Sequence, residues 1–356
     1  MRILALPREE TNPYQELLYG EMRRHGVRVT YLGGLTSSHT VNLLLLPAEV
    51  AVRRLGGARV VHLHWVYAFG LPLSTSRFQL LRRVTEAWFT GWLWALRLLG
   101  MRLVWTAHNA LPITPIFADD LRARRRLVAA CDLVIAHSKA SLEELAQLGI
   151  VPRRSVIIPH GPFASAVDLD SLRTPGEGRE ARRLLFFGKV RAYKGVDTLL
   201  RAFAALPPDL DVHLTVAGEC GDEDMRAELA ALAAGSGGRV TLQLERVPEA
   251  QVTALLEQAD AMVLPYERIT TSGSGVLGLC HGRPLVVPDL PGLAELPDDA
   301  VLRYDGTAAG LAGALAGIAQ ADAAVLAKMS AAALAYCADN SWSEIAKRTL
   351  TAINEK

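Results

Sequence analysis

The chain has 356 residues, of which 50% are hydrophobic and 21% charged. This length suffices for about two domains with buried cores of their own, and the composition excludes a largely disordered chain. The four cysteines have no CxxC spacing, and we expect them to be reduced, mostly buried thiols of a cytosolic protein. They are Cys131, Cys220, Cys280 and Cys337.

The net charge of +1 hides an uneven distribution. Residues 1–175 carry 21 Lys and Arg against 13 Asp and Glu, a balance of +8, and residues 176–356 carry 17 against 24, a balance of −7. The basic half suits an anionic membrane surface, a pyrophosphate-bearing substrate or a nucleic acid. Because no nucleic-acid-binding signature accompanies the charge, we expect no nucleic-acid partner. An ordinary surface distribution is the alternative.

The segment Val84–Leu96 is apolar and aromatic, and arginines flank it. It is too short to span a bilayer as a helix, which takes about 20 residues. The pattern indicates either an amphipathic helix at a membrane interface or an ordinary core helix. We expect a cytoplasmic protein, and a peripheral contact of the basic N-terminal domain with the inner face of the cell membrane stays open.

Short apolar runs alternate with helical patterns in the first half of the chain. Buried strands separated by helices predict a doubly wound parallel sheet. The expected strands are Arg2–Leu6, Val27–Tyr31, Val60–His64, Arg102–Trp105, Leu133–Ala136 and Val156–Pro159, and the expected helices include Tyr14–His25, Phe78–Leu99 and Ala118–Ala130.

A polar stretch, Asp168–Glu180, interrupts the pattern, which then restarts. The expected strands of the second half are Arg183–Phe187, Val212–Ala217, Val240–Leu244, Ala261–Pro265 and Leu285–Val287, and its expected helices include Val196–Ala205, Glu223–Ala234 and Glu249–Gln258. The expected fold is therefore α/β, with two Rossmann-like doubly wound parallel-sheet domains facing a cleft. We place an N-terminal domain at 1–168, a linker at 169–181 and a C-terminal domain at 182–340, and the helix 341–356 is free to pack back on the first domain. Ligands bind beyond the carboxyl ends of strands in such sheets, so the loops after strands deserve the closest look.

The segment 188–195, GKVRAYKG, follows the expected strand Arg183–Phe187. Lys189, Arg191 and Lys194 place three cations on one strand-to-helix connection, where the helix dipole also favours an anion. A diphosphate site is the functional interpretation, and a solvated basic turn is the alternative.

Two later loops add polar groups. The turn Ser272–Gly275, SGSG, follows a strand and opens a helical stretch, so its amides and hydroxyls suit a second anion contact. Glu295 follows the strand at Leu285–Val287 and could accept bonds from sugar or ribose hydroxyls, although a surface or capping role is as plausible for a glutamate there.

Histidines end two strands of the first half. His62 and His64 fall on one face by alternation, and His108 with Asn109 follows another strand. A histidine at a strand end can serve as a base or as a hydrogen-bond donor to substrate. No His/Cys spacing fits zinc, and no P-loop or dinucleotide fingerprint follows a strand, so we expect no metal and no resident cofactor.

Together these segments resemble the GT-B glycosyltransferases, close to glycosyltransferase family 4. FFGKVRAYKGVDTLLRAF, VAGE, ADAMVLPY and GRPLVVPDLPGLAEL match the donor-binding half in order and spacing. NPYQELLYGEMRRHG, HLHW and HN are similar to bacterial exopolysaccharide-type members, some of which transfer mannose. The resemblance implies metal-independent transfer of a sugar from a UDP- or GDP-sugar to a hydroxyl of a glycan, lipid-linked or small-molecule acceptor.

The resemblance also implies roles for particular residues. His108, Arg191 and Lys194 would be catalytic, with His108 touching the transferring sugar. Donor binding would fall to Gly188, Lys189, Glu219, Ser272, Gly273, Ser274, Gly275 and Glu295, and acceptor binding to Asn12, Tyr14, His64, Trp65 and Asn109.

Two departures from the family pattern keep alternatives open. The two family glutamates eight residues apart fall on Ile269 and Leu277, and residues of the Glu9–Tyr14 segment stand where a glycine-rich loop often lies. A nucleotide-sugar epimerase or a sugar phosphorylase of the same fold is one alternative. A catalytically degenerate partner subunit is the other.

Overall fold

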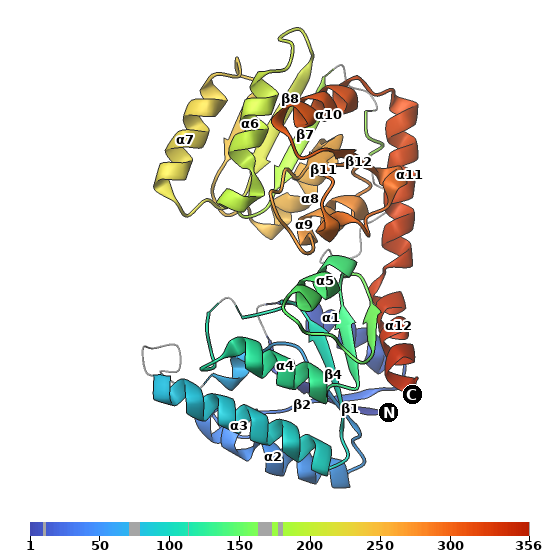
Figure 1. Ribbon diagram of the computed structural model, residues 1–356. Coiled ribbons are helices and arrows are strands. Elements are labelled where there is room, and N and C mark those ends of the chain that lie inside the picture. The colour runs from blue at the N-terminus through green and yellow to red at the C-terminus, as the bar shows by residue number, and fades with distance from the viewer. Residues whose placement is uncertain (10–11, 71–78, 113, 163–172, 177–180, 356) are drawn as a thin grey trace. The chain divides into compact units, whose positions relative to one another are not determined.

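The computed structural model describes residues 1–9, 12–70, 79–112, 114–162, 173–176 and 181–355. It divides into two compact units (Figure 1). Unit 1 comprises Met1–Pro159 and Trp342–Lys356, and unit 2 comprises His160–Ser341. The expected boundary at 168 and most of the expected linker 169–181 lie outside the described residues, and the expected cleft stays a prediction.

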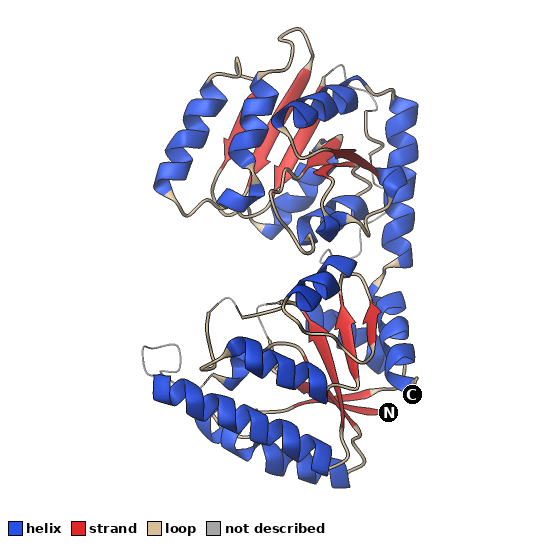
Figure 2. Cartoon of the chain, viewed as in Figure 1, coloured by secondary structure: helices blue, strands red, loops and turns tan. Residues whose placement is uncertain are grey.

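Unit 1 is built on a six-stranded parallel sheet in the order β2-β1-β3-β4-β5-β6, with helices around it (Figure 2). Its strands are β1 (Arg2–Leu6), β2 (Arg28–Tyr31), β3 (Val60–Leu63), β4 (Arg102–Ala107), β5 (Leu133–Ala136) and β6 (Ser155–Ile157). Its helices are α1 (Tyr14–Arg24), α2 (His39–Leu55), α3 (Gln79–Leu98), α4 (Asp120–Ala130), α5 (Lys139–Gln147) and α12 (Trp342–Asn354), with a short 3-10 turn η1 (Val66–Phe69).

The last helix, α12, returns to unit 1 and packs on α1. Trp342, Ile345 and Ile353 share a buried cluster with residues of β1 and α1. The guanidinium of Arg154 donates to the carbonyl oxygens of Ala352 and Glu355, each at 2.9 Å, which fastens the end of the helix. The C-terminal helix is therefore part of the core of unit 1.

Unit 2 is a second six-stranded parallel sheet, in the order β12-β11-β10-β7-β8-β9. Its strands are β7 (Arg182–Phe187), β8 (Val212–Ala217), β9 (Val240–Gln243), β10 (Ala261–Val263), β11 (Leu285–Pro288) and β12 (Val301–Tyr304). Its helices are α6 (Val196–Ala204), α7 (Glu223–Ala234), α8 (Glu249–Gln258), α9 (Gly273–Cys280), α10 (Ala308–Gln320) and α11 (Ala323–Asp339), with the 3-10 turns η3 (Ala192–Lys194), η4 (Pro291–Leu293) and η5 (Asp298–Ala300).

The prediction of two doubly wound parallel sheets is confirmed. Helices cover both faces of a parallel sheet, so every residue of a central strand is buried. Continuous apolar runs are therefore the segments that form these strands. β5 (LVIA) and β11 (LVVP) are buried at every position. β12 and the helices α2, α5, α10 and α11 are additions that the sequence analysis does not name.

The two sheet orders place a topological switch point in each unit. In unit 2 the chain reverses direction of winding between β7 and β10, and in unit 1 between β1 and β3. Ligands of open α/β sheets bind beyond the carboxyl ends of the strands at such a point. The loops after β7 and β10 in unit 2, and after β1 and β3 in unit 1, are therefore the places to look for a site.

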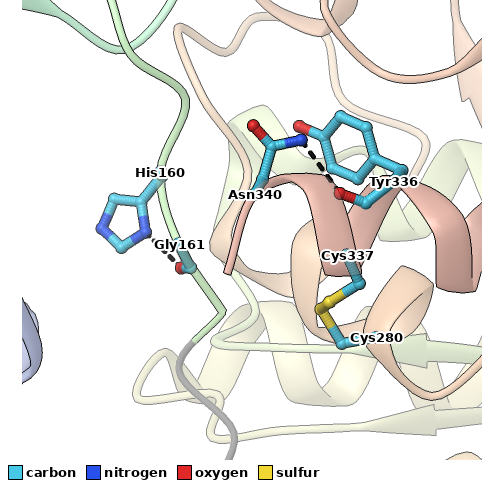
Figure 3. Close-up of a disulfide and its surroundings, with 6 residues drawn as sticks. All are labelled: His160, Gly161, Cys280, Tyr336, Cys337 and Asn340. Atoms are coloured by element: carbon cyan, nitrogen blue, oxygen red, sulfur yellow. Dashed lines mark hydrogen bonds between the residues drawn. A yellow bond between two sulfur atoms is a disulfide. The ribbon is translucent and has the colours of Figure 1, made fainter. Parts of the chain in front are cut away.

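The expectation of four reduced cysteines is wrong for two of them. Cys280, the last residue of α9, forms a disulfide with Cys337 of α11, with Cα atoms 5.3 Å apart (Figure 3). Cys131 and Cys220 are free and buried, as expected. The pair is 57 residues apart in sequence and comes together only because α9 packs on α11. The cytosolic location inferred from the cysteine spacing stays a prediction.

Within the described ranges, no single helix has the length and apolarity to cross a membrane. Among the helices that the structure describes, one pair, α10 and α11, meets those criteria when taken together, and it is bent by 106° at its junction.

Candidate functional site

The loop after β7 carries the cations that the sequence singled out. It begins at Gly188, whose φ of +137° is a conformation that L side chains rarely adopt. A Cβ at this position would lie 2.8 Å from Oγ of Ser274 and 3.2 Å from Nζ of Lys194. The backbone conformation therefore favours glycine at the end of β7, and two polar side chains converge on the space beside it.

Lys194 is the half-buried cation of this loop. Its ammonium lies 5.4 Å from the ring centre of Tyr266, which follows β10. Burial lowers the pKa of Lys194, and the nearby Arg191 lowers it further. An anion placed beside the two cations would relieve both effects, so the electrostatics favour binding of a negatively charged group here. Lys189 and Arg191 are exposed on the same loop.

The loop after β10 contributes a helix N-terminus. Ser272 caps α9 by accepting the amide of Gly275 at 3.0 Å, and its hydroxyl also pairs with that of Tyr266 at 3.0 Å. Burial raises the pKa of Tyr266 to about 12, so the phenol stays neutral. Gly273 and Ser274 open the helix, where backbone N–H groups lack intrahelical acceptors and the dipole favours an anion.

Close backbone packing joins these loops into one unit. Gly195 has φ +64°, and a Cβ there would collide with the carbonyl oxygen of Pro265 after β10. A Cβ at Gly292 in η4 would likewise collide with the carbonyl oxygen of Ile269. The loops after β7, β10 and β11 therefore pack closely against one another. Glu295 is half-buried just beyond η4 and lies at the same edge of the sheet.

A cavity of about 300 Å³ adjoins the end of β7. Gly188, Lys189 and Glu219, all predicted to bind the donor, line it together with Arg246 and Val247. The sequence analysis missed the last two residues. They follow β9, and the rule that ligands bind after strands could have found them.

In unit 1 the predicted His62, His64 and His108 form a buried hydrogen-bonded network with Tyr19 and His137, which the sequence analysis does not name. The hydroxyl of Tyr19 lies 3.0 Å from Nδ1 of His62 and 2.7 Å from Nε2 of His64. Nδ1 of His64 lies 3.2 Å from Nε2 of His108, whose Nδ1 lies 3.3 Å from Nε2 of His137. Alternation placed His62 and His64 on one face, and their ring centres are 4.3 Å apart.

The ends of the network fix its protonation pattern. Nδ1 of His137 faces the carbonyl oxygen of Ile158 at 3.0 Å, and a carbonyl only accepts, so His137 carries its proton on Nδ1. We assign the others in turn: His108 donates to His137, His64 to His108, Tyr19 to His64 and His62 to Tyr19. Nε2 of His62 then accepts from the hydroxyl of Thr106 at 2.8 Å. One set of neutral tautomers thus satisfies all five of these hydrogen bonds within the network and the bond from His137 to Ile158.

Burial keeps the inner histidines neutral. It lowers the pKa of His62 to about 3 and lowers those of His64 and His137 as well. His108 is the member of the network that is partly exposed. Trp65 stacks on it, with ring centres 4.4 Å apart and an angle of 14° between the planes.

The predicted acceptor residues surround this network at different depths. Tyr14 and His64 are each only 1% exposed and lie behind His108; Tyr14 places its ring 4.9 Å from that of His108. Asn12 is half-buried, and its side chain accepts the amide of Tyr14 at 3.0 Å where α1 begins. Trp65 is half-buried and Asn109 exposed. The loops after β1, β3 and β4 thus bring the predicted residues of unit 1 together.

Among the described residues, no group of three or more His, Cys, Asp or Glu side chains is arranged to hold a metal ion. Lys194, Arg191 and the N-terminus of α9 contribute positive charge to the unit 2 site, and Lys189 and Arg246 add theirs at the cavity.

Two parallel-sheet units, one of them with a basic loop and a helix N-terminus at its switch point, are the architecture of the GT-B fold. Residues 16–162 match the model of "Glycosyltransferase Family 4", and residues 181–321 match that of "Glycosyl transferases group 1". The chain is accordingly a GT-B glycosyltransferase of the family 4 type.

Curated relatives agree with this assignment. A GDP-mannose:glycolipid 4-beta-D-mannosyltransferase of Xanthomonas campestris pv. campestris is 28% identical over 254 residues, which cover 69% of this chain and 67% of that protein. A D-inositol 3-phosphate glycosyltransferase of Geodermatophilus obscurus is 29% identical over 197 residues, which cover 49% of this chain and 42% of that protein. The match thus spans two thirds or less of these relatives' own length.

Solved structures share the fold along the whole chain. Sucrose-phosphate synthase from Thermosynechococcus elongatus superposes with a TM-score of 0.67 at 17% identity, covering 98% of this chain and 97% of that one. HepE of Anabaena, solved in complex with UDP, gives a TM-score of 0.67 at 18% identity and covers 99% of both chains.

Proposed function

We propose that this glycosyltransferase moves a hexosyl group from a UDP- or GDP-sugar to an acceptor hydroxyl without a metal ion. The observation that carries the proposal is the convergence of Lys194, Ser274 and the start of α9 on Gly188 in unit 2. These groups suit a diphosphate, because charge-assisted hydrogen bonds and a helix N-terminus both favour an anion.

The chemistry follows from where charge develops. The acceptor oxygen forms a bond to the anomeric carbon, and the bond from that carbon to the β-phosphate oxygen breaks. The nucleoside diphosphate leaves with the electron pair, and a phosphate oxygen of this leaving group takes up the proton of the acceptor hydroxyl. Lys194 and Arg191 stabilise the growing negative charge, as donors aimed at a leaving group do. Two cationic side chains with a helix N-terminus supply the charge that a divalent cation supplies elsewhere, which supports metal independence.

In this proposal the remaining donor-binding residues surround the diphosphate. Gly273 and Gly275 let the backbone of α9 approach it, and the cavity that Glu219 and Lys189 line offers room for part of the nucleoside. Glu295 is the carboxylate left to accept sugar or ribose hydroxyls, because Ile269 and Leu277 replace the two family glutamates.

In this proposal unit 1 binds the acceptor. His108, partly exposed and stacked on Trp65, would contact the transferring sugar, while Asn12 and Asn109 would contact acceptor hydroxyls. The name of the Xanthomonas relative makes GDP-mannose and a glycolipid the first pair to test. We place the reaction at the cytoplasmic face of a membrane, since basic surfaces suit the anionic lipids there.

The test is release of nucleoside diphosphate from GDP-mannose, GDP-glucose, UDP-glucose and UDP-galactose with EDTA present. We expect one donor to turn over when a polyprenyl-diphosphate-linked saccharide is added, with the sugar recovered on that lipid. Release that needs inorganic phosphate would favour a phosphorylase, and isomerised donor without transfer would favour an epimerase. Full loss of activity with EDTA, restored by Mg²⁺, would refute metal independence.

A further inference from the structure

The solvent-facing side of α3 is apolar along the whole helix. The exposed residues recur every three or four positions, and Leu80, Trp94 and Leu98 are 72%, 60% and 83% exposed. A surface helix of a globular protein normally shows polar residues on that side. The complete stripe is Leu80, Val84, Ala87, Gly91, Trp94 and Leu98.

The neighbouring helix, α2, repeats the pattern. Val52 and Leu55 are 67% and 91% exposed, although α2 also buries an apolar side of its own. The two helices pack side by side at the outer edge of unit 1 (Figure 1). The exposed stripe of α2 is Val41, Leu44, Leu45, Ala48, Val52 and Leu55. We call the two stripes together the α2–α3 face.

Charge around the α2–α3 face has one sign. Arg53, Arg83 and Arg97 are exposed beside the stripes. Each helix has one acidic residue, and both are buried and paired: Glu49 accepts a hydrogen bond from the amide of Gly33 at 3.0 Å and lies 3.8 Å from the guanidinium of Arg53, and Glu86 accepts a hydrogen bond from Nε of Arg122 at 2.6 Å. An apolar centre with a basic margin results.

We propose that the α2–α3 face is the surface by which this chain docks on a bilayer that contains anionic lipid. Both helices would lie in the plane of the interface, with Leu55, Trp94 and Leu98 among the acyl chains and the arginines at the level of the phosphates. Amphipathic helices with Trp and Leu on one side and Arg at the margin bind membranes in this way. The proposal goes beyond the transfer reaction and depends on no donor residue.

Charge complementarity favours a membrane over a second copy of the chain. A symmetric pairing through this face would bring arginines of both copies together without an exposed carboxylate of either helix between them. Anionic headgroups offer the opposite charge around an apolar interior, which matches both parts of the face.

The test is co-sedimentation of the full chain with vesicles of phosphatidylcholine alone, and of phosphatidylcholine with 30% phosphatidylglycerol. We expect binding to the anionic vesicles that weakens as salt rises. The double variant L55E/L98E should lose at least about tenfold in partition coefficient. R83Q/R97Q should lose roughly 30-fold on anionic vesicles, about fivefold for each charge. V325E, an exposed apolar position on α11 in unit 2, is the matched control and should bind as the wild type does.

Two measurements keep the outcome decisive. Nucleoside diphosphate affinity of each variant should equal that of the wild type, which shows that the protein is folded and separates this proposal from the transferase proposal. No binding of wild type to anionic vesicles, or equal loss in V325E, would overturn the membrane face. Sedimentation velocity showing a wild-type dimer that L55E/L98E dissociates, without vesicle binding, would overturn it in favour of a contact between copies.

Discussion

Replacing Lys194 by Gln should weaken binding of the donor diphosphate far more than it disturbs the fold. Lys194 is half-buried, and its ammonium lies near Ser274, the ring of Tyr266 and the start of α9. Glutamine keeps a polar group of similar reach and removes the charge. Hydrogen bonds to charged groups contribute about 1.5–3 kcal/mol, so the dissociation constant for GDP or UDP should rise roughly 10- to 150-fold.

Isothermal titration of GDP and UDP into wild type and K194Q measures this change. K328Q is the matched control, because Lys328 is an exposed lysine on α11 of the same unit. We expect K328Q to bind as the wild type does, and both variants to melt within a few degrees of it. An unchanged affinity in K194Q, with the fold intact, would refute the assignment of Lys194 to the diphosphate.

Three further predictions concern turnover, pH and backbone conformation. H108Q should lower kcat at least tenfold with little change in diphosphate affinity; an equal loss of both would contradict a role at the transferring sugar. Because burial lowers the pKa of His62 to about 3, the unfolded chain binds a proton below pH 6.5 that the folded chain does not. The free energy of unfolding should then fall by about 1.4 kcal/mol per pH unit below that point for this residue alone, and urea titrations at pH 5 and 7 should show a shallower fall in H62N. G195A should lower the free energy of unfolding by at least about 2 kcal/mol, since it combines φ +64° with a collision against Pro265. Thermal melts of G195A and of the control G221A, where a Cβ meets nothing within 4 Å, test this. Equal melting temperatures of the two variants would contradict it.

The sequence predicted the sheets well because their strands are continuous apolar runs. β1, β5 and β8 have the predicted bounds. A short continuous apolar run is typical of a parallel strand that is buried on both faces. The sequence could not give the strand order, since that depends on which crossover each helix takes. The sequence therefore predicted the basic loop after β7 and the glycine-rich loop after β10 as separate features. It did not show that β7 and β10 are neighbours, which brings the two loops together.

Long-range packing explains what the sequence analysis missed or misjudged. The Cys280–Cys337 pair needs α9 to pack on α11. The histidine network needs Tyr19 of α1 to stand between His62 and His64, and nothing in the local sequence marks that tyrosine. For α3 the sequence allowed two interpretations, a helix at a membrane interface and a helix of the core. The structure shows that one side of α3 is buried in the core while its exposed side is also apolar.

A thermal-shift titration with GDP, UDP, ADP and dTDP, each with Mg²⁺ and with EDTA, tests the central claim most directly. A ligand at 100 times its dissociation constant adds about 2.7 kcal/mol to the free energy of unfolding, which such a measurement resolves. We predict stabilisation by GDP or UDP that is the same with Mg²⁺ and with EDTA, and that K194Q lowers by at least about half. No stabilisation by any of the four nucleotides would contradict the assignment of a nucleoside diphosphate sugar as the donor.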